Sequence, residues 1–181
     1  YHFPNLTLVG VIDADLGLRG GDLRAGERTY QQLVQVSGRA GRAEKSGQVF
    51  LQTYEPEHPV VHALLSGDGE AFLDAEGQSR ARYHMPPYGQ LVAIILSGVD
   101  LSAVMEQGRV LAQAAPGIED VAFMGPAPAP LARVRGRYRA RLLVHAKKRS
   151  GIQRLIADWL ASAKAVKGVR IRVDVDPHSF L

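Results

Sequence analysis

Residues 85–96 read MPPYGQLVAIIL, and this stretch separates two different sequence patterns. Two consecutive prolines have fixed φ angles and no backbone N–H groups, so they predict that the preceding helix ends here. The apolar run at 91–96 that follows has the length of a buried β-strand. It is much shorter than the roughly 20 apolar residues that cross a bilayer. We therefore place a domain boundary close to residues 83–89.

The residues after this boundary predict a domain in which strands and helices alternate. Strands are expected over 91–96, 120–124, 137–145 and 169–175, and helices over 101–114 and 152–163. The stretch GPAPAP at 125–130 is expected to form a loop, because proline fits neither a helix interior nor a central strand. The order β-α-β-β-α-β predicts an α+β ferredoxin-like domain.

The residues before the boundary predict a smaller α/β unit. The apolar run LTLVGVI at 6–12 indicates a buried strand that ends at Asp13 and Asp15. A glycine-containing loop follows, and the next expected elements are a helix over 24–37, a strand over 47–53, and helices over 59–65 and 70–83. A strand that ends in acidic residues, followed by such a loop and a helix, is the layout of a RecA-like lobe.

The composition indicates a globular protein, with 46% hydrophobic and 22% charged residues in a chain of 181. The chain has no Cys, which excludes disulfides, cysteine-based zinc sites and thiol nucleophiles. Its first residues, YHFP, contain neither an initiator Met nor a signal peptide, so we expect the C-terminal part of a longer protein. The net charge of +4 hides a basic block, because residues 121–157 hold nine Lys and Arg and no Asp or Glu. Such a block in an acidic background indicates a surface for a polyanion.

The sharpest local motif is QVSGRAGR at residues 35–42. Two glycines and two arginines alternate directly after a helix, in a loop tight enough to aim both guanidinium groups at one point. Guanidinium is permanently charged and forks onto phosphate oxygens, so the pair suits the charge on a transferring phosphoryl group. A C-capping glycine followed by a solvated basic turn explains the bare motif equally well.

This motif resembles motif VI, Q-x-x-G-R-x-G-R, of superfamily 2 helicases. Five stretches are similar to the PriA family of replication-restart helicases: residues 2–18, 22–47, 86–89 (PPYG), 125–144 (GPAPAPLARVRGRYRARLLV) and 174–177 (DVDP). The last two argue against another superfamily 2 translocase. The resemblance implies the end of helicase lobe 2 over 1–55, with the tail of motif V and motif VI. It also implies a helical connector over 56–83 and a PriA-type C-terminal domain that binds DNA and SSB over 84–181.

By this resemblance, Arg39 and Arg42 would be catalytic groups that face the γ-phosphate of ATP, with Arg42 as the arginine finger. Gln35 and Gly38 would complete the ATP-binding set. ATP and Mg²⁺ would act in the intact protein, which would also bind zinc outside this fragment. The chain itself contains no GxxxxGK[ST] Walker A motif and no DEAH-like Walker B motif. The fragment alone is therefore expected to bind none of these cofactors and to be inactive as an ATPase.

Five arginines occupy alternate positions in the basic block: Arg133, Arg135, Arg137, Arg139 and Arg141. A continuous strand would project all of them from one face. Gly136 is expected to break the run with a turn, which leaves the last three on one strand with Tyr138 facing the other way. Like charges at this spacing repel unless something neutralises them, so we expect DNA phosphates there rather than a solvated sheet face. No base-reading signature is present, which favours backbone recognition.

The helix expected over 152–163 begins beside several basic residues, and such a helix start can bind an anion. In the PriA family an Arg and a Gln at this helix start contribute to a pocket for the acidic C-terminal tail of the single-stranded DNA-binding protein, SSB. Arg149 and Gln153 fit that spacing of four. From spacing alone, ordinary exposed polar residues are at least as good an explanation.

No metal site is expected in the chain. Asp13 and Asp15 resemble the acids that end motif V, where they couple the lobes. His58 and His62 have a ligand-like spacing of four, but Pro59 between them excludes an H-E-x-x-H pattern, and no third ligand is evident.

The resemblance implies the C-terminal portion of an ATP-dependent 3′–5′ DNA helicase that recognises stalled or abandoned replication forks and initiates primosome assembly. Its partners would be branched or forked DNA, single-stranded DNA, the SSB tail and other primosome proteins, and no membrane. It would act in the bacterial cytoplasm, at the nucleoid. The alternative is an ATPase-inactive module that binds DNA and serves as a primosome scaffold.

Overall fold

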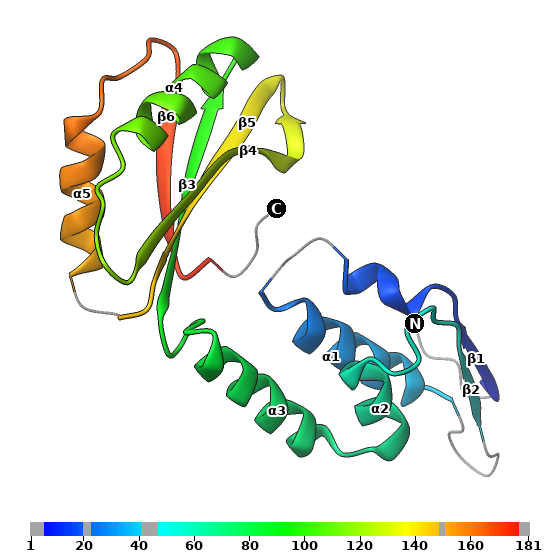
Figure 1. Ribbon diagram of the computed structural model, residues 1–181. Helices are drawn as coiled ribbons and strands as arrows, with labels where there is room; N and C mark the ends of the chain where they lie inside the picture. Colours follow the sequence, from blue (N-terminus) through cyan, green and yellow to red (C-terminus); the bar gives the residue numbers. More distant parts are fainter. Residues whose placement is uncertain (1–5, 20–22, 41–46, 149–150, 178–181) are drawn as a thin grey trace. The chain divides into compact units, whose positions relative to one another are not determined.

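The computed structural model describes residues 6–19, 23–40, 47–148 and 151–177 (Figure 1). The chain divides into two compact units, Tyr1–Glu76 and Gly77–Leu181. The point of division lies inside helix α3 (Gly69–Arg82). No helix in the described part of the chain is long and apolar enough to cross a membrane.

The first unit has strands and helices where its sequence predicts them, but β1 is exposed or half-buried along its length, so the expectation of a buried strand is wrong for the residues in this structure. Strands β1 (Leu8–Val11) and β2 (Gln48–Leu51) pair in parallel. The unit also contains helices α1 (Ala25–Ser37) and α2 (Pro59–Ser66) and the first part of α3. The expected loop after β1 begins with a short 3-10 helix, η1 (Ala14–Gly17). The buried core contains Leu33 of α1, Val60 and Ala63 of α2, and Phe72 of α3.

One face of the β1–β2 pair carries exposed apolar side chains. Leu8 is 56% exposed and Phe50 is 63% exposed, and the register places both on the same face. Parallel sheets are normally covered on both faces, and two strands alone make a sheet of marginal stability. This face of the first unit therefore has the composition of a buried surface.

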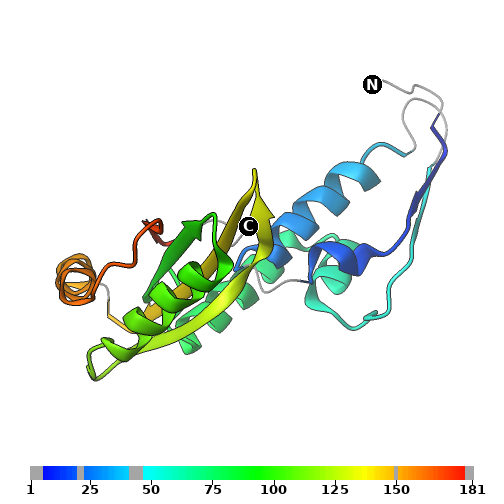
Figure 2. The same cartoon turned by 90° about the horizontal axis from the view of Figure 1, so that it is seen from above.

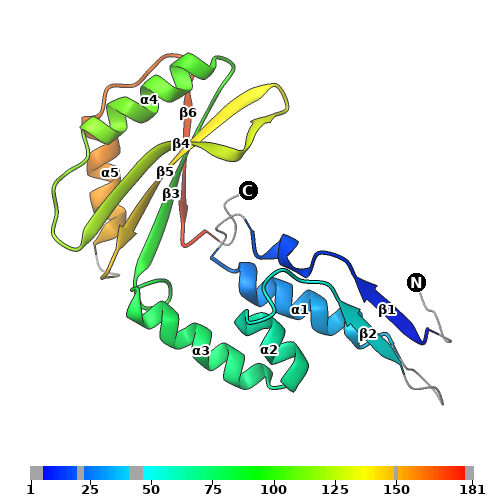
Figure 3. The same cartoon turned by 45° about the vertical axis from the view of Figure 1, so that its right-hand side comes forward.

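The second unit contains a four-stranded antiparallel sheet and two helices. Its elements are β3 (Gln90–Gly98), α4 (Leu101–Gln113), β4 (Val121–Val134), β5 (Arg137–Ala146), α5 (Ile152–Ser162) and β6 (Arg170–Val175). This is the predicted order β-α-β-β-α-β, and the strands lie in the order β4-β5-β3-β6. Figures 2 and 3 show that α4 and α5 cover the same face of the sheet.

The main core lies between this sheet and its two helices. It is made by alternate residues of the two central strands: Val92, Ile94 and Leu96 of β3, and Ala140, Leu142 and Val144 of β5. Trp159 of α5 is 2% exposed, and its Nε1–H donates a hydrogen bond of 3.0 Å to the carbonyl oxygen of Leu111 in α4. Its ring meets Phe123 edge-on, with 4.8 Å between ring centroids. The prediction that Trp159 is a core residue is confirmed.

The expectation of a loop over residues 125–130 is wrong, because these residues form the middle of β4. Strand β4 lies at the edge of the sheet, where proline costs no hydrogen bond on the outer side. Gly125 has φ +104°, and a Cβ atom there would lie 2.8 Å from the carbonyl oxygen of Arg141. A Cβ atom on Gly108 of α4 would lie 2.5 Å from Pro126, so this motif packs closely against that helix.

Two of the stretches that resemble the PriA family hold the start of β3 in place. In PPYG, a Cβ atom on Gly89 would lie 1.9 Å from the carbonyl oxygen of His84, so only glycine fits. In DVDP, Asp176 has φ +48°, its carboxylate accepts a hydrogen bond of 3.0 Å from the N–H of Leu91, and its own N–H donates one of 2.7 Å to the Leu91 carbonyl oxygen. Both motifs therefore have a structural role.

Candidate nucleic-acid interface

Helices α4 and α5 pack against one face of the sheet of the second unit, and we call the opposite face the open face. Odd-numbered residues of β3 and β5 and even-numbered residues of β6 point to it, because their neighbours on β3 and β5 form the core beneath α4 and α5. Arg137, Arg139 and Arg141 therefore share the open face, as predicted. Tyr138 lies on the opposite side and packs against the core.

The other two arginines of the run lie elsewhere. Arg135 and Gly136 have φ +48° and +76° and form the two-residue turn between β4 and β5, which confirms the expected turn. Arg133 is paired with Tyr138, and its guanidinium carbon lies 5.2 Å from that ring's centroid. The five arginines therefore do not act from one strand face.

Two arginines that the sequence reasoning missed complete the open face. Arg170 and Arg172 of β6 lie across β3 from the arginines of β5. The register forms two rows across the sheet, which we call the arginine rows: Arg139, Ser97 and Arg170 in one, and Arg141, Ile95 and Arg172 in the other. The alternation in RIRVDV (170–175) places the two arginines on one face of β6. Assigning that face to the arginines of β5 also requires the strand order, in which β6 lies beside β3, the first strand of this unit.

The arginines of the open face differ in how they are held. Arg137 Nη2 donates a hydrogen bond of 3.1 Å to the carbonyl oxygen of Ser97, which fixes its head group against β3. Arg172 Nη2 lies 3.2 Å from Asp174 Oδ2, and its side chain is 72% exposed. Arg139 and Arg141 are half-buried and Arg170 is exposed.

The accessible part of the open face is the end that carries these arginines. Farther along, Leu91 and Ala93 are buried, and the His145 Nε2 atom lies 2.8 Å from the carbonyl oxygen of His84. Among the described strand residues, the open face has no Phe, Tyr or Trp on which a base could stack. These strand residues can therefore offer cations to phosphates but no aromatic ring for base stacking.

A cleft of about 230 Å³ lies beside the start of α5. Its lining combines apolar side chains, among them Ile118, Ile152 and Leu155, with Lys148 and the two acidic residues Glu119 and Asp120. Gln153 is exposed on the first turn of α5, whereas Arg149 lies outside the described residues.

Asp120 lines the same cleft and is paired with two lysines. Its carboxylate lies 2.9 Å from Lys147 Nζ and 3.6 Å from Lys148 Nζ. The hydrogen bond from Lys147 is the main cause that lowers the pKa of Asp120, and the charges of both lysines add to it. Asp120 is therefore ionised near neutral pH, and the two lysines neutralise it.

The glycine-arginine motif follows helix α1. Gln35, Gly38 and Arg39 are exposed, whereas Arg42 lies outside the described residues. Gly38 follows the last helical residue with φ −66°, so it does not adopt the left-handed conformation that favours a capping glycine. A Cβ atom on Gly38 would lie 3.2 Å from the carbonyl oxygen of Val34, so close approach to the helix backbone, and not a left-handed conformation, favours glycine here.

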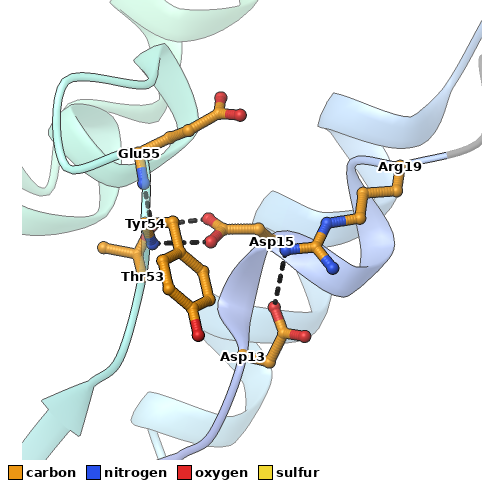
Figure 4. A network of polar contacts seen from close by, with 6 residues as sticks. All are labelled: Asp13, Asp15, Arg19, Thr53, Tyr54 and Glu55. Atoms are coloured by element: carbon orange, nitrogen blue, oxygen red, sulfur yellow. Dashed lines mark hydrogen bonds and ion pairs between the residues drawn. The ribbon is translucent and has the colours of Figure 1, made fainter.

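The acidic residues after β1 form a structural network rather than a metal pair (Figure 4). Asp15 is 3% exposed, and its carboxylate accepts hydrogen bonds from the Thr53 hydroxyl and from the Tyr54 N–H, the latter at 2.7 Å. These two bonds, that of Thr53 first, lower the pKa of Asp15. The Oδ1 atom of Asp13 instead lies 3.7 Å from Nη2 of Arg19. The network thus ties the end of β1 to the segment after β2.

The two histidines with ligand-like spacing also have other roles. The His58 side chain accepts a hydrogen bond of 3.2 Å from the Val60 N–H at the start of α2. His62 Nε2 lies 2.9 Å from Glu57 Oε2. Within the described ranges, no three His, Asp or Glu side chains are grouped so that they could hold a metal ion.

The chain is similar to one known domain family and to several known proteins. The family model for the primosomal protein N C-terminal domain matches residues 81–178. Replication restart protein PriA of Rickettsia felis is 42% identical over 180 residues, which cover 99% of this chain and 28% of the relative. The Bacillus subtilis protein of the same name is 35% identical over 184 residues, covering 99% and 23%, and that of Haemophilus influenzae is 37% identical over 186, covering 99% and 25%.

The chain spans about a quarter of the length of these relatives. The family match covers more than half of the chain, and the relatives align with nearly all of it. The chain therefore belongs to the PriA family and corresponds to the C-terminal region of its members.

Proposed function

We propose that this chain is the C-terminal part of an ATP-dependent 3′–5′ DNA helicase that recognises stalled or abandoned replication forks and initiates primosome assembly in the bacterial cytoplasm. The observation that carries the proposal is the arginine-rich open face in a chain of the PriA family. In this proposal, residues 1–55 form the end of the second helicase lobe, and residues 56–83 form a helical connector to the next domain. Residues 84–181 form a ferredoxin-like domain that binds forked or single-stranded DNA.

The first unit contributes to ATP turnover in this proposal. Its parallel β1–β2 pair belongs to a larger sheet, and helices of the lobe outside this chain cover the face that exposes Leu8 and Phe50. Gln35, Arg39 and Arg42 face the phosphates of ATP, which is held with Mg²⁺ mainly by parts of the protein outside this chain, since the chain has no Walker A motif. Exposure of Gln35 and Arg39 at the end of α1 supports this role.

Replacing Arg137, Arg139 and Arg141 together by Ser is expected to weaken DNA binding about tenfold. Each phosphate neutralised on duplex DNA contributes about 0.9 to the slope of log affinity against log salt, so loss of three contacts flattens the slope by about 2.7. All DNA sequences should be affected alike, because phosphate contacts carry no base information. Fluorescence anisotropy of the chain with forked DNA over a salt series measures both quantities. Unchanged affinity and slope in the triple variant would contradict DNA binding by the open face.

We also propose that the cleft at the start of α5 binds the C-terminal tail of SSB. Its apolar lining by Ile118, Ile152 and Leu155 suits a buried apolar side chain, and Lys148 beside the helix N-terminus suits an acidic peptide. Arg149 and Gln153 then act as the polar contacts of the peptide. Ionised Asp120 would repel the peptide if Lys147 and Lys148 did not neutralise it.

Replacing Arg149 by Ala is expected to reduce affinity for an SSB-tail peptide about tenfold, because a hydrogen bond to a charged group contributes about 1.5–3 kcal/mol. Affinity for DNA should change little. The matched control is Arg154→Ala on the same helix, where the guanidinium Nε lies 3.8 Å from Asp158 and the side chain is 91% exposed. Anisotropy with a labelled peptide measures the effect, and equal peptide affinity in both variants would argue against this cleft.

A further inference from the structure

We propose that Arg170 and Arg172 of β6 bind the DNA backbone together with Arg139 and Arg141 of β5, and that Asp174 competes with phosphate for Arg172. The arginine rows then form one phosphate-binding array across β3. This inference rests on the proposed binding of DNA by the open face, and it adds a second strand and an internal competitor to that site.

The register places the four arginines in a compact array. Strands in a sheet lie about 4.8 Å apart, so the β5 and β6 positions of one row are separated by about 10 Å across β3. The two rows are two residues apart along each strand, or about 6.7 Å. Phosphates of one strand of duplex DNA follow one another about every 3.4 Å along the helix axis, and because the backbone also winds around that axis, neighbouring phosphates lie farther apart in space than this rise. Neighbouring rows can therefore contact phosphates of the same DNA strand.

The side chains of β3 that lie between the arginines of β5 and β6 are compatible with a bound phosphate. The β3 residues within the rows are Ser97 and Ile95, which are uncharged and half-buried. Guanidinium groups on β5 and β6 repel each other across β3, and an anion between them reduces this repulsion. Asp174 is the one acidic side chain among the described strand residues that point to the open face. The described strand residues of the open face thus include five arginines and one aspartate, so together they carry a net positive charge.

The chemistry of the face favours the backbone over bases. Four-stranded sheets that read single-stranded nucleic acid stack bases on aromatic side chains. The corresponding described positions here hold residues such as Ala93, Ile95 and Met124. Binding by the array should therefore depend on salt and show little dependence on DNA sequence.

Asp174 is placed to compete with DNA. Its Oδ2 atom lies 3.2 Å from Arg172 Nη2, on the same strand and the same face. A phosphate that binds the Nη2 group of Arg172 competes with this carboxylate. Replacing Asp174 by Asn keeps the size of the side chain and removes its charge, so it frees Arg172 and removes a repulsive group from the path of the backbone.

The test uses two double variants of the chain with the same change in net charge. Arg170→Ser with Arg172→Ser removes the β6 half of the array. Arg109→Ser with Arg154→Ser removes two exposed arginines of α4 and α5, which pair with Glu106 and Asp158 of their own helices on the covered side of the sheet. Circular dichroism confirms that each variant is folded. Anisotropy is measured with labelled oligo(dT), oligo(dA) and a forked DNA over a salt series.

The β6 double variant is expected to bind all three DNAs about tenfold more weakly. Its salt slope should flatten by about 1.8 on duplex arms and about 1.4 on single strands, which corresponds to two lost phosphate contacts. The α4/α5 double variant should keep the original slope. Asp174→Asn should bind severalfold more tightly than the unmodified chain, and this gain should disappear when Arg172 is also replaced by Ser.

The results distinguish DNA binding by the open face from its extension to the arginines of β6. If the β5 triple variant loses affinity and the β6 double variant behaves like its α4/α5 control, the extension to β6 is wrong and DNA binding by the open face stands. If neither the β5 nor the β6 variant loses affinity, the open face does not bind DNA and both proposals fail. Unchanged or weaker binding by Asp174→Asn overturns its role as a competitor, and a strong preference between oligo(dT) and oligo(dA) overturns backbone recognition.

Discussion

Replacing Arg42 by Ala is expected to reduce DNA-stimulated ATP hydrolysis about 10³-fold or more in a full-length protein that carries this chain. An arginine finger stabilises charge that develops on the γ-phosphoryl group only in the transition state. Its loss therefore lowers turnover and leaves the ground-state affinities for ATP and DNA largely unchanged. Steady-state ATPase assays measure the first quantity, and equilibrium binding of a nucleotide analogue and of forked DNA measures the second.

Two further variants sharpen this test. Arg42→Lys keeps the charge but loses the planar fork, so it should restore only a small part of the activity. Arg154→Ala removes an exposed arginine of α5 and should leave turnover unchanged. Turnover of Arg42→Ala within a few-fold of the unmodified protein would remove Arg42 from the active site. A full-length protein with a degenerate Walker A lysine and no ATPase activity at all would instead support the scaffold alternative.

Replacing Trp159 by Ala is expected to destabilise the second unit by about 3–5 kcal/mol, the usual cost of removing a buried aromatic side chain. The variant loses the packing of the indole against the sheet and its edge-on contact with Phe123. It also leaves the carbonyl oxygen of Leu111 without the hydrogen bond from Nε1. Urea unfolding followed by far-UV circular dichroism measures the change, since the variant has no tryptophan fluorescence.

Matched variants separate the two contributions of Trp159. Trp159→Phe keeps an aromatic ring in the core and loses the hydrogen bond, so it should cost about 1–3 kcal/mol. Tyr83→Ala removes an aromatic side chain that is 58% exposed and should change the free energy of unfolding by about 0.5 kcal/mol or less. Equal stability of Trp159→Ala and Tyr83→Ala would show that the core between sheet and helices is not placed as described.

The element order of the second unit could be predicted because its signals are local. Side-chain alternation with a period of two marks β5 and assigns Arg137, Arg139 and Arg141 to one face without any knowledge of the fold. Gly136 can take a positive φ at low cost, so the turn before β5 is also readable from the sequence. The fixed φ of two prolines likewise marks the end of α3.

The GPAPAP stretch shows where local reasoning fails. Proline is excluded from central strands because it lacks a hydrogen-bond donor, but on an edge strand that donor can face outward. Whether a segment lies at an edge depends on the order of all four strands. The same limit applies to DVDP, where the contact of Asp176 with Leu91 joins residues that are far apart in the sequence.

The sequence by itself determined the order of the strands and helices, the turn at Gly136 and the arginine-bearing side of β5, but not the extent of β4. Only the tertiary structure decided that Arg170 and Arg172 join that side, because β3 lies between β5 and β6 and aligns their residues. Alternation within a strand follows from the local backbone geometry, which two or three residues establish. Neighbours within a sheet follow from pairings between distant segments, which the packing of α4 and α5 against the whole sheet selects.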